Sequence, residues 1–259
     1  MSRPVETVLI TGASSGLGLE LAELFAADGS NLILVARRAE LLNDLAGRMS
    51  SRYGVRAEVL ATDLSGTGAV EELESRVRQL DLQVDVLVNS AGFGARGAFA
   101  ELPVERQISM LQVNITALTH LSRLFLPGMI ERDRGGIINL SSLAGFLPGP
   151  NMAIYYASKA YVLAFSEALQ EEVRGTGVTV CCIAPGPTET GFVEAAGLEG
   201  VRFFRLGAMS ARPVARSGYR GFRAGRALVV PGISNRAATL LLRLSPRLLT
   251  RRVSGWLNV

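Results

Sequence analysis

The sequence predicts a single α/β domain built on a doubly wound, parallel β-sheet. Short runs of β-branched residues and leucine alternate along the chain with longer segments of helical periodicity. The short runs are apolar at successive positions, as in strands that are buried on both faces. The 259 residues, of which 48% are hydrophobic, show no linker, repeat or low-complexity tract. One domain of this length can bury a core without disulfides or metals.

Seven strands and five main helices are expected, in alternating order. The strands are predicted at Thr7–Ile10, Asn31–Val35, Ala57–Ala61, Val84–Val88, Gly136–Leu140, Val178–Ile183 and Ala227–Val230. The helical patterns cover Leu17–Ala27, Glu40–Tyr53, Val70–Gln79, Val104–Ile130 and Ala153–Gly175. Strict alternation of strand and helix implies parallel pairing with right-handed crossovers.

The C-terminal part of the chain differs from the rest in its charge. Residues 1–200 carry 15 basic and 23 acidic side chains, whereas residues 201–259 carry 12 arginines and no acidic residue. This balance suits a solvated surface, an arginine-rich subunit contact, or attraction to an anionic partner such as a carrier or coenzyme thioester or a lipid surface. Nucleic acid is not expected as a partner, because no groove-reading motif accompanies the charge.

Two segments of this region have their own predictions, within one domain that spans residues 1–259. Residues 191–226, rich in glycine, arginine and phenylalanine, are expected to form a substrate-covering insert. Residues 233–257 have leucines and arginines at helical spacing and predict an amphipathic segment that bends or breaks at Pro246. This segment could cap the substrate pocket, join subunits or lie on an anionic bilayer, and burial against protein is the commoner fate of such a stripe.

The ends and the cysteines bear on the compartment. The chain enters a strand pattern at Val5 without the features of a signal peptide, and no apolar stretch is long enough to span a bilayer. Cys181 and Cys182 are adjacent in an apolar run and resemble small core residues, so no disulfide framework is expected. A cytoplasmic protein is therefore expected, and no metal site is predicted.

A glycine-rich turn follows the first predicted strand and opens the first predicted helix. Its residues are Gly12, Ser14, Ser15, Gly16, Leu17 and Gly18. Glycines allow the backbone to turn tightly and to approach a pyrophosphate, which N–H groups at the start of the helix then bind. Because the turn lies between a strand and a helix, it predicts a dinucleotide site.

The end of the second predicted strand indicates which dinucleotide is bound. In dinucleotide-binding folds an acidic residue usually stands there and binds the adenosine ribose 2′-hydroxyl. Here Ala36 occupies about that position, and Arg37 and Arg38 follow it. A guanidinium group binds a 2′-phosphate through charge-assisted, bidentate hydrogen bonds, whereas a carboxylate would repel it. We therefore predict NADP as the cofactor.

Tyr155 and Lys159 are the predicted catalytic pair. They are four residues apart in a helical pattern, so their side chains share one face, and Lys159 is the only lysine in the sequence. Tyrosine normally titrates near 10, too high for efficient proton exchange at neutral pH. A cation about 4 Å away lowers the pKa of a phenol. Tyr155 is thus expected to give a proton to a carbonyl or take one from an alcohol.

Ser142 is a third candidate, because it follows the strand that ends at Leu140 and precedes Tyr155 by 13 residues. Its hydroxyl could stabilise a developing alkoxide, or it could be a turn or cap residue. A serine hydrolase is disfavoured. No G-x-S-x-G elbow is present, and the only histidine, His120, lies in an amphipathic helical pattern.

Together these residues resemble the short-chain dehydrogenase/reductase family in its compact, NADP-preferring branch, closely over residues 5 to about 190. The resemblance adds Asn114 to the catalytic group of Ser142, Tyr155 and Lys159, as a residue whose helix distortion seats a water in the proton relay. It implies that Tyr155 and Lys159 also contact the cofactor. The other cofactor residues that it implies are Asp63, Leu64, Asn89, Ala91, Gly92, Pro185, Gly186, Thr188 and Thr190.

The chain is further similar to bacterial proteins labelled ketoacyl reductases. The resemblance implies an NADPH-dependent oxidoreductase that interconverts a carbonyl and an alcohol by hydride transfer, on an apolar ketone or a 3-oxoacyl thioester. The alternative is a non-catalytic NADP(H)-binding sensor or scaffold protein. A homodimer or homotetramer is expected. The residues that could line an apolar substrate pocket, or instead pack a lid, are Phe93, Phe146, Leu147, Pro148 and Phe192.

Overall fold

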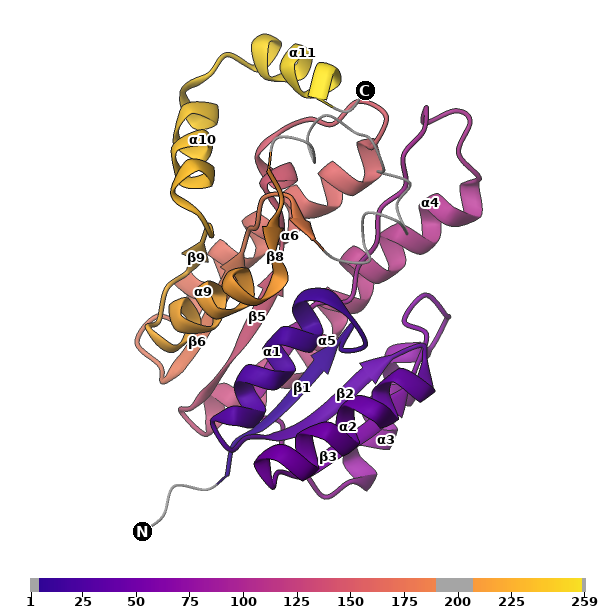
Figure 1. Ribbon diagram of the computed structural model, residues 1–259, viewed down its shortest axis with the longest axis vertical. Helices are drawn as coiled ribbons and strands as arrows, with labels where there is room; N and C mark the ends of the chain where they lie inside the picture. Colours follow the sequence, from indigo (N-terminus) through magenta and orange to yellow (C-terminus); the bar gives the residue numbers. More distant parts are fainter. Residues whose placement is uncertain (1–4, 190–206, 258–259) are drawn as a thin grey trace.

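The computed structural model describes residues 5–189 and 207–257. Seven parallel strands form one sheet in the order β3-β2-β1-β4-β5-β6-β9, with helices on both faces (Figure 1). The strands are β1 (Thr7–Thr11), β2 (Asn31–Ala36), β3 (Ala57–Ala61), β4 (Val86–Asn89), β5 (Gly135–Leu140), β6 (Val178–Ile183) and β9 (Leu228–Val229). Each predicted strand is present with its ends shifted by two residues at most. The doubly wound, Rossmann-like sheet is confirmed.

The helices also follow the predicted order. They are α1 (Gly16–Ala27), α2 (Ala39–Tyr53), α3 (Ala69–Gln79), α4 (Val104–Leu111), α5 (Leu118–Glu131), α6 (Ala153–Glu172), α9 (Ala211–Arg223), α10 (Ile233–Leu244) and α11 (Arg247–Leu257). The pattern predicted as one helix over Val104–Ile130 is divided by a π-helical segment, Gln112–Ala117. Outside the main sheet, β7 (Thr188–Glu189) pairs in parallel with β8 (Met209–Ser210).

The core has two layers, one on each face of the sheet. Along β1, Val8 and Ile10 point to the layer that contains α1, α2 and α9, whereas Leu9 points to the layer that contains α3 and α5. All three side chains are fully buried, which removes their apolar surface from water and stabilises the fold. The strands are therefore apolar at successive positions because both faces are covered.

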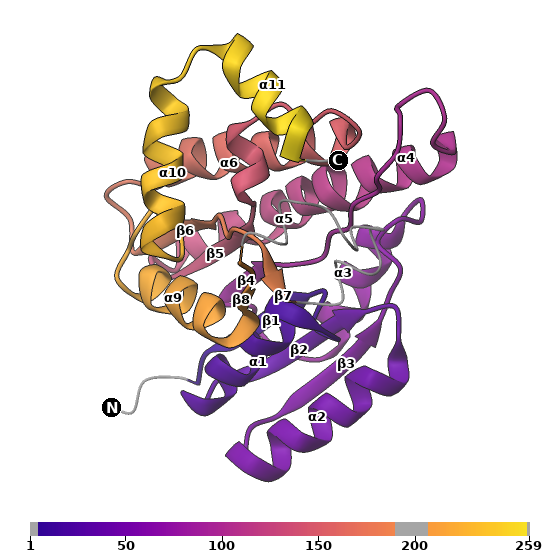
Figure 2. The same cartoon turned by 45° about the horizontal axis from the view of Figure 1, so that its top comes forward.

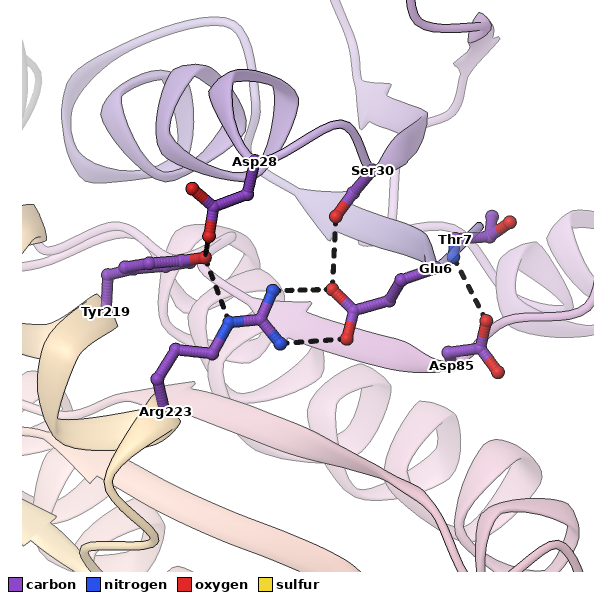
Figure 3. A network of polar contacts seen from close by, with 7 residues as sticks. All are labelled: Glu6, Thr7, Asp28, Ser30, Asp85, Tyr219 and Arg223. Carbon is purple, nitrogen blue, oxygen red and sulfur yellow. Dashed lines mark hydrogen bonds and ion pairs between the residues drawn. The ribbon is translucent and has the colours of Figure 1, made fainter. Parts of the chain in front are cut away.

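Helix α9 is joined to α1 and β1 by a polar network (Figure 3). Arg223 donates to both carboxylate oxygens of Glu6 at 2.8 and 2.6 Å, and its Nε donates to the Tyr219 hydroxyl at 2.9 Å. Tyr219 in turn donates to Asp28 at the end of α1, and its ring packs edge-on against Phe25, with centroids 4.9 Å apart. These contacts hold α9 in the helical layer beside α1.

The range 191–226, predicted as a substrate-covering insert, therefore divides into two parts. Residues 191–206 lie outside the described residues. The later part forms α9, whose Ala215, Tyr219 and Phe222 belong to the main core. This helix packs on the sheet, so a substrate-covering insert stays a prediction for residues 191–206.

The C-terminal helices α10 and α11 form an arm at the opposite end of the molecule from α2 (Figures 1 and 2). They are separated at Ser245 and Pro246, as the sequence predicts. Burial against this chain, the commoner fate of an apolar stripe, is not what the structure shows: Ile233, Leu241 and Leu244 are 86%, 66% and 78% exposed. Among the described residues, no helix is both long and apolar enough to cross a membrane.

Candidate active site

A cavity of about 1050 Å³ lies along the carboxyl ends of the strands. Its walls come from the segments that follow β1 to β6, the place where ligands bind in open α/β sheets. Most of the predicted site residues line it together. These are Gly12, Ser14, Ser15, Gly16, Leu17, Arg37, Arg38, Asp63, Leu64, Ala91, Gly92, Ser142, Tyr155, Lys159, Pro185, Gly186 and Thr188.

The glycine turn after β1 is packed too closely for side chains. Gly12 has a φ of +67°, and a Cβ there would lie 2.8 Å from the Ala91 nitrogen. A Cβ on Gly18 would lie 2.4 Å from the Gly12 carbonyl oxygen. Thr11 ties this turn to the loop after β4, because its hydroxyl accepts hydrogen bonds from the Ser90 and Ala91 nitrogens at 3.1 Å. The start of α1 is thereby open to an anionic group.

Charged residues after β2 and β3 line the same cavity. Arg38 donates to the Ser14 hydroxyl at 3.3 Å, and Arg37 lies beside Asp63. Asp63 accepts hydrogen bonds from the Ser65 nitrogen at 3.0 Å and hydroxyl at 2.8 Å. Partial burial opposes ionisation, but these hydrogen bonds and the Arg37 charge together lower the pKa of Asp63. This wall presents two guanidinium groups and a serine hydroxyl to a ligand.

Ser142 has the capping role that its position predicts, and stabilisation of a developing alkoxide stays a prediction. Its hydroxyl accepts a hydrogen bond from the Ala144 nitrogen at 3.1 Å and so caps the 3₁₀ turn Leu143–Phe146. The same hydroxyl is hydrogen-bonded to the phenol of Tyr155. Tyr155 lies on the first turn of α6, and this contact fixes its hydroxyl in the wall of the cavity.

Lys159 is buried one helical turn beyond Tyr155. Its ammonium donates to the Leu140 carbonyl oxygen at 2.7 Å and lies 5.8 Å from the centre of the Tyr155 ring. Burial lowers the pKa of Lys159 to about 8. A group with this pKa is still mostly charged at neutral pH and loses its proton just above it.

The expected lowering of the Tyr155 pKa is not found in the protein by itself. Burial raises the pKa of Tyr155 well above its usual value, and the hydrogen bond from Ser142 only partly offsets this effect. The sequence estimate assumed a fully charged ammonium close to the phenol. Instead, the Lys159 ammonium donates a hydrogen bond to the Leu140 carbonyl oxygen, and desolvation disfavours the charged forms of both Tyr155 and Lys159.

Asn114 lies in the π-helical segment between α4 and α5 and is fully buried. Its side chain accepts from the Phe93 nitrogen at 3.1 Å and donates to the Phe93 oxygen at 3.0 Å and the Ser158 hydroxyl at 3.1 Å. It therefore clamps the loop after β4 to α6. Gly92 lies between Asn114 and Lys159, because a Cβ there would be 3.1 Å from Asn114 Oδ1 and 3.5 Å from Lys159 Nζ.

Two predicted cofactor residues, Asn89 and Gly18, do not line the cavity. Asn89 is buried behind the cavity, where its amide donates to Asn139 at 2.9 Å and to Ser122 at 3.1 Å, so it joins β4, β5 and α5 and does not line the cavity. Gly18 also lies outside the cavity, and its contact with Gly12 gives it a packing role. Thr190 lies outside the described residues.

Sequence reasoning missed several residues that line the cavity. Arg106, Ser109 and Val113 are spaced so that they share one helix face, but nothing in the sequence shows that this face meets the cavity. Arg106 lies 6.0 Å from the centre of the Phe93 ring. Of the predicted apolar pocket residues, Phe93 lines the cavity, Phe146 packs on a small core cluster, and Phe192 lies outside the described residues.

Comparison with known proteins identifies relatives of this chain. A very-long-chain 3-oxoacyl-CoA reductase from Anas platyrhynchos is 36% identical over 183 residues, which cover 68% of this chain and 58% of the relative. A short-chain dehydrogenase from Sphingobium yanoikuyae, solved in complex with NADPH, is 34% identical with a TM-score of 0.84 and 92% coverage of both chains. A short-chain dehydrogenase/reductase from Burkholderia phymatum, solved with NAD, is 26% identical with a TM-score of 0.81 and 92% coverage of both chains.

The family model for short chain dehydrogenases matches residues 6–199, which contain the glycine turn and the Ser142, Tyr155 and Lys159 side chains. The sheet order, the cavity that contains both the glycine turn and Tyr155, and these matches all indicate the same family. The chain belongs to the short-chain dehydrogenase/reductase family of oxidoreductases.

Proposed function

We propose that this protein is an NADPH-dependent oxidoreductase that interconverts a carbonyl and an alcohol on an apolar substrate. One observation carries the proposal: Tyr155, bonded to Ser142 and one turn from Lys159, lines the same cavity as the glycine turn and Arg37. A proton donor thus shares one cavity with a surface that suits a dinucleotide.

The cavity fits NADPH by its shape and donors. The glycine turn and the start of α1 line the cavity, where backbone N–H groups would bind a pyrophosphate, and Arg37 and Arg38 would bind the 2′-phosphate. Since relatives are solved with NADPH and with NAD, the preference for NADP rests on these two guanidinium groups.

The bound nicotinamide would supply the hydride. Ser142 would donate a hydrogen bond to the substrate oxygen as negative charge develops there. Tyr155 would transfer its proton to that oxygen. Burial raises the pKa of the phenol and so opposes this transfer, which neighbouring groups must therefore assist. Lys159 would bind the ribose and supply positive charge beside the phenol. Asn114 would hold the loop after β4 against α6 and so keep these groups in place.

The substrate class is proposed from the cavity wall and one relative. Phe93, Val113 and Met152 supply apolar wall to the cavity, which suits an apolar ketone. The Anas platyrhynchos relative is named for a 3-oxoacyl thioester. A 3-oxoacyl thioester is therefore the first substrate to test.

Consumption of NADPH with a panel of apolar ketones and 3-oxoacyl thioesters tests the proposal. We expect turnover with at least one of them, and slower turnover when NADH replaces NADPH. Tight NADPH binding without turnover on any substrate would support the alternative, a non-catalytic sensor or scaffold. Equal affinity for NADH and NADPH would contradict the role of Arg37 and Arg38.

A further inference from the structure

The arm formed by α10 and α11 has an exposed aliphatic face. Fourteen large hydrophobic side chains are exposed among the described residues, and seven of them lie in this short segment. Their exposed fractions range from 43% to 86%. They are Ile233, Leu240, Leu241, Leu244, Leu248, Leu249 and Val253. An apolar patch of this kind marks a surface that meets a partner.

Between residues 233 and 255, where burial is described, the arm faces the body with polar side chains. The buried residues of this stretch are Thr239, Thr250 and Ser254, which all carry a hydroxyl group. Arg236 donates to the Val230 carbonyl oxygen at 2.9 Å, and Arg243 lies 5.7 Å from the Phe146 ring centre and 3.8 Å from Glu167. The arrangement is the reverse of a helix that packs its leucines on its own core. The leucine face is therefore directed away from the chain.

The charge of the arm narrows the choice of partner. Residues 201–259 contain 12 arginines and no acidic residue. Arg247, Arg251 and Arg252 are exposed, and none of them forms an ion pair with another residue that the structure describes. Arginine binds phosphate through bidentate hydrogen bonds, and its aliphatic stem can lie along an apolar surface. Exposed leucines flanked by arginines suit a surface in which anionic groups cover an apolar layer.

We propose that the arm binds the surface of an anionic lipid bilayer. The leucine face would enter the boundary between headgroups and acyl chains, and the arginines would bind lipid phosphates. A contact between two copies through this same face is disfavoured, because a two-fold contact places each patch against itself and would bring arginine rows together without any carboxylate on the arm. The proposal concerns where the protein binds and does not depend on the proposed reaction.

Flotation of the full-length protein with lipid vesicles tests the proposal. We expect binding to vesicles of phosphatidylcholine mixed with phosphatidylglycerol, weaker binding at high salt, and little binding to phosphatidylcholine alone. The apolar variant Leu241→Ser/Leu249→Ser should lose about tenfold or more in partitioning. The charge variant Arg247→Gln/Arg251→Gln should lose about tenfold and should respond less to salt.

Matched controls lie on α2, at the other end of the molecule (Figure 1). Leu41→Ser removes an exposed leucine, and Arg48→Gln/Arg52→Gln removes two exposed arginines. Both control variants should float like the unaltered protein, because they lie away from the arm. The two arginine variants lose the same net charge, so a difference between them is an effect of position. Thermal unfolding of every variant shows whether it is folded, and a folded Leu241→Ser/Leu249→Ser variant with unchanged flotation would overturn the proposal.

Sedimentation of the same variants gives their oligomeric state. This measurement distinguishes a lipid bilayer from a second copy of the chain as the partner of the leucine face. If the unaltered protein does not float, and Leu241→Ser/Leu249→Ser converts a larger assembly into a smaller one, the face is a subunit contact and the lipid proposal is wrong. If flotation is lost while the assembly is unchanged, the lipid proposal stands.

Discussion

At the scale of single residues, burial controls the chemistry of the candidate site. Lys159 is only 8% exposed, and its ammonium donates a hydrogen bond to the Leu140 carbonyl oxygen. Tyr155 is surrounded by Ser142, Tyr156 and the wall of the cavity. In this environment desolvation disfavours the charged form of both groups, so the pKa of the phenol rises and that of the ammonium falls. The protein without ligand thus holds a proton on Tyr155.

The lowered pKa of Lys159 predicts a dependence of stability on pH. Burial lowers the pKa of the ammonium to about 8 in the folded protein, from 10.5 in its ordinary state. Between pH 8 and pH 10.5 the unfolded chain therefore binds more protons than the folded protein. The free energy of unfolding should therefore rise through the interval by about 3 kcal/mol more in the unaltered protein than in Lys159→Met. Urea unfolding at the two ends of the interval measures this, and a difference below about 1 kcal/mol would contradict the buried-ammonium account.

Arg37 predicts the cofactor preference. Arg37→Asp replaces attraction of the 2′-phosphate by repulsion, so the ratio of dissociation constants for NADH and NADPH should move at least tenfold in favour of NADH, which corresponds to about 1.4 kcal/mol. Arg52→Asp makes the same change of charge on α2, away from the cavity, and should leave the ratio unaltered. A ratio that moves equally in both variants would show a general charge effect without a 2′-phosphate site.

At the scale of secondary structure elements, α9 completes the helical layer beside α1. Tyr219 is 9% exposed and is hydrogen-bonded to Asp28 and Arg223, and burial raises its pKa to about 12. Tyr219→Phe keeps the ring contact with Phe25 but leaves Asp28 without this donor.

We expect Tyr219→Phe to lower the free energy of unfolding by about 1 to 2 kcal/mol. Affinity for NADPH should not change, because α9 does not line the cavity. Tyr161→Phe, on the exposed side of α6, is the control and should have a smaller effect. Denaturant unfolding measures both variants, and equal stability of Tyr219→Phe and the unaltered protein would show that the network in Figure 3 does not hold α9.

The sequence predicted the elements better than their interruptions. Apolar runs located every strand of the main sheet, since both faces of the sheet are covered. The apolar period did not reveal the π-helical segment at Gln112–Ala117, because insertion of a wider turn changes backbone bonding while leaving that period nearly intact. Only the family resemblance, which implies a helix distortion at Asn114, indicated it. Likewise α9 was assigned to an insert, because its four arginines conceal the small buried face of Val214, Ala215, Tyr219 and Phe222.

At the scale of the whole molecule, the parallel sheet explains why distant motifs meet. Parallel strands end at one edge, so residues that follow β1, β2, β5 and β6 line a single cavity although they are far apart in the sequence. The motifs and the family resemblance together predicted about half of the residues that line the cavity. They could not predict the direction of the Tyr155 pKa or the outward leucine face of the arm, because both depend on which side chains are removed from water.

The central claim is that Tyr155 transfers the proton in an NADPH-dependent reaction, and one measurement tests it most directly. The turnover number of Tyr155→Phe is compared with that of the unaltered protein on the best substrate, with the dissociation constant for NADPH measured on both. We expect turnover to fall by a factor of about 100 or more, with NADPH affinity almost unchanged, because the variant keeps the ring and loses the proton. A variant that keeps more than about a tenth of the turnover would show that the proton comes from another group.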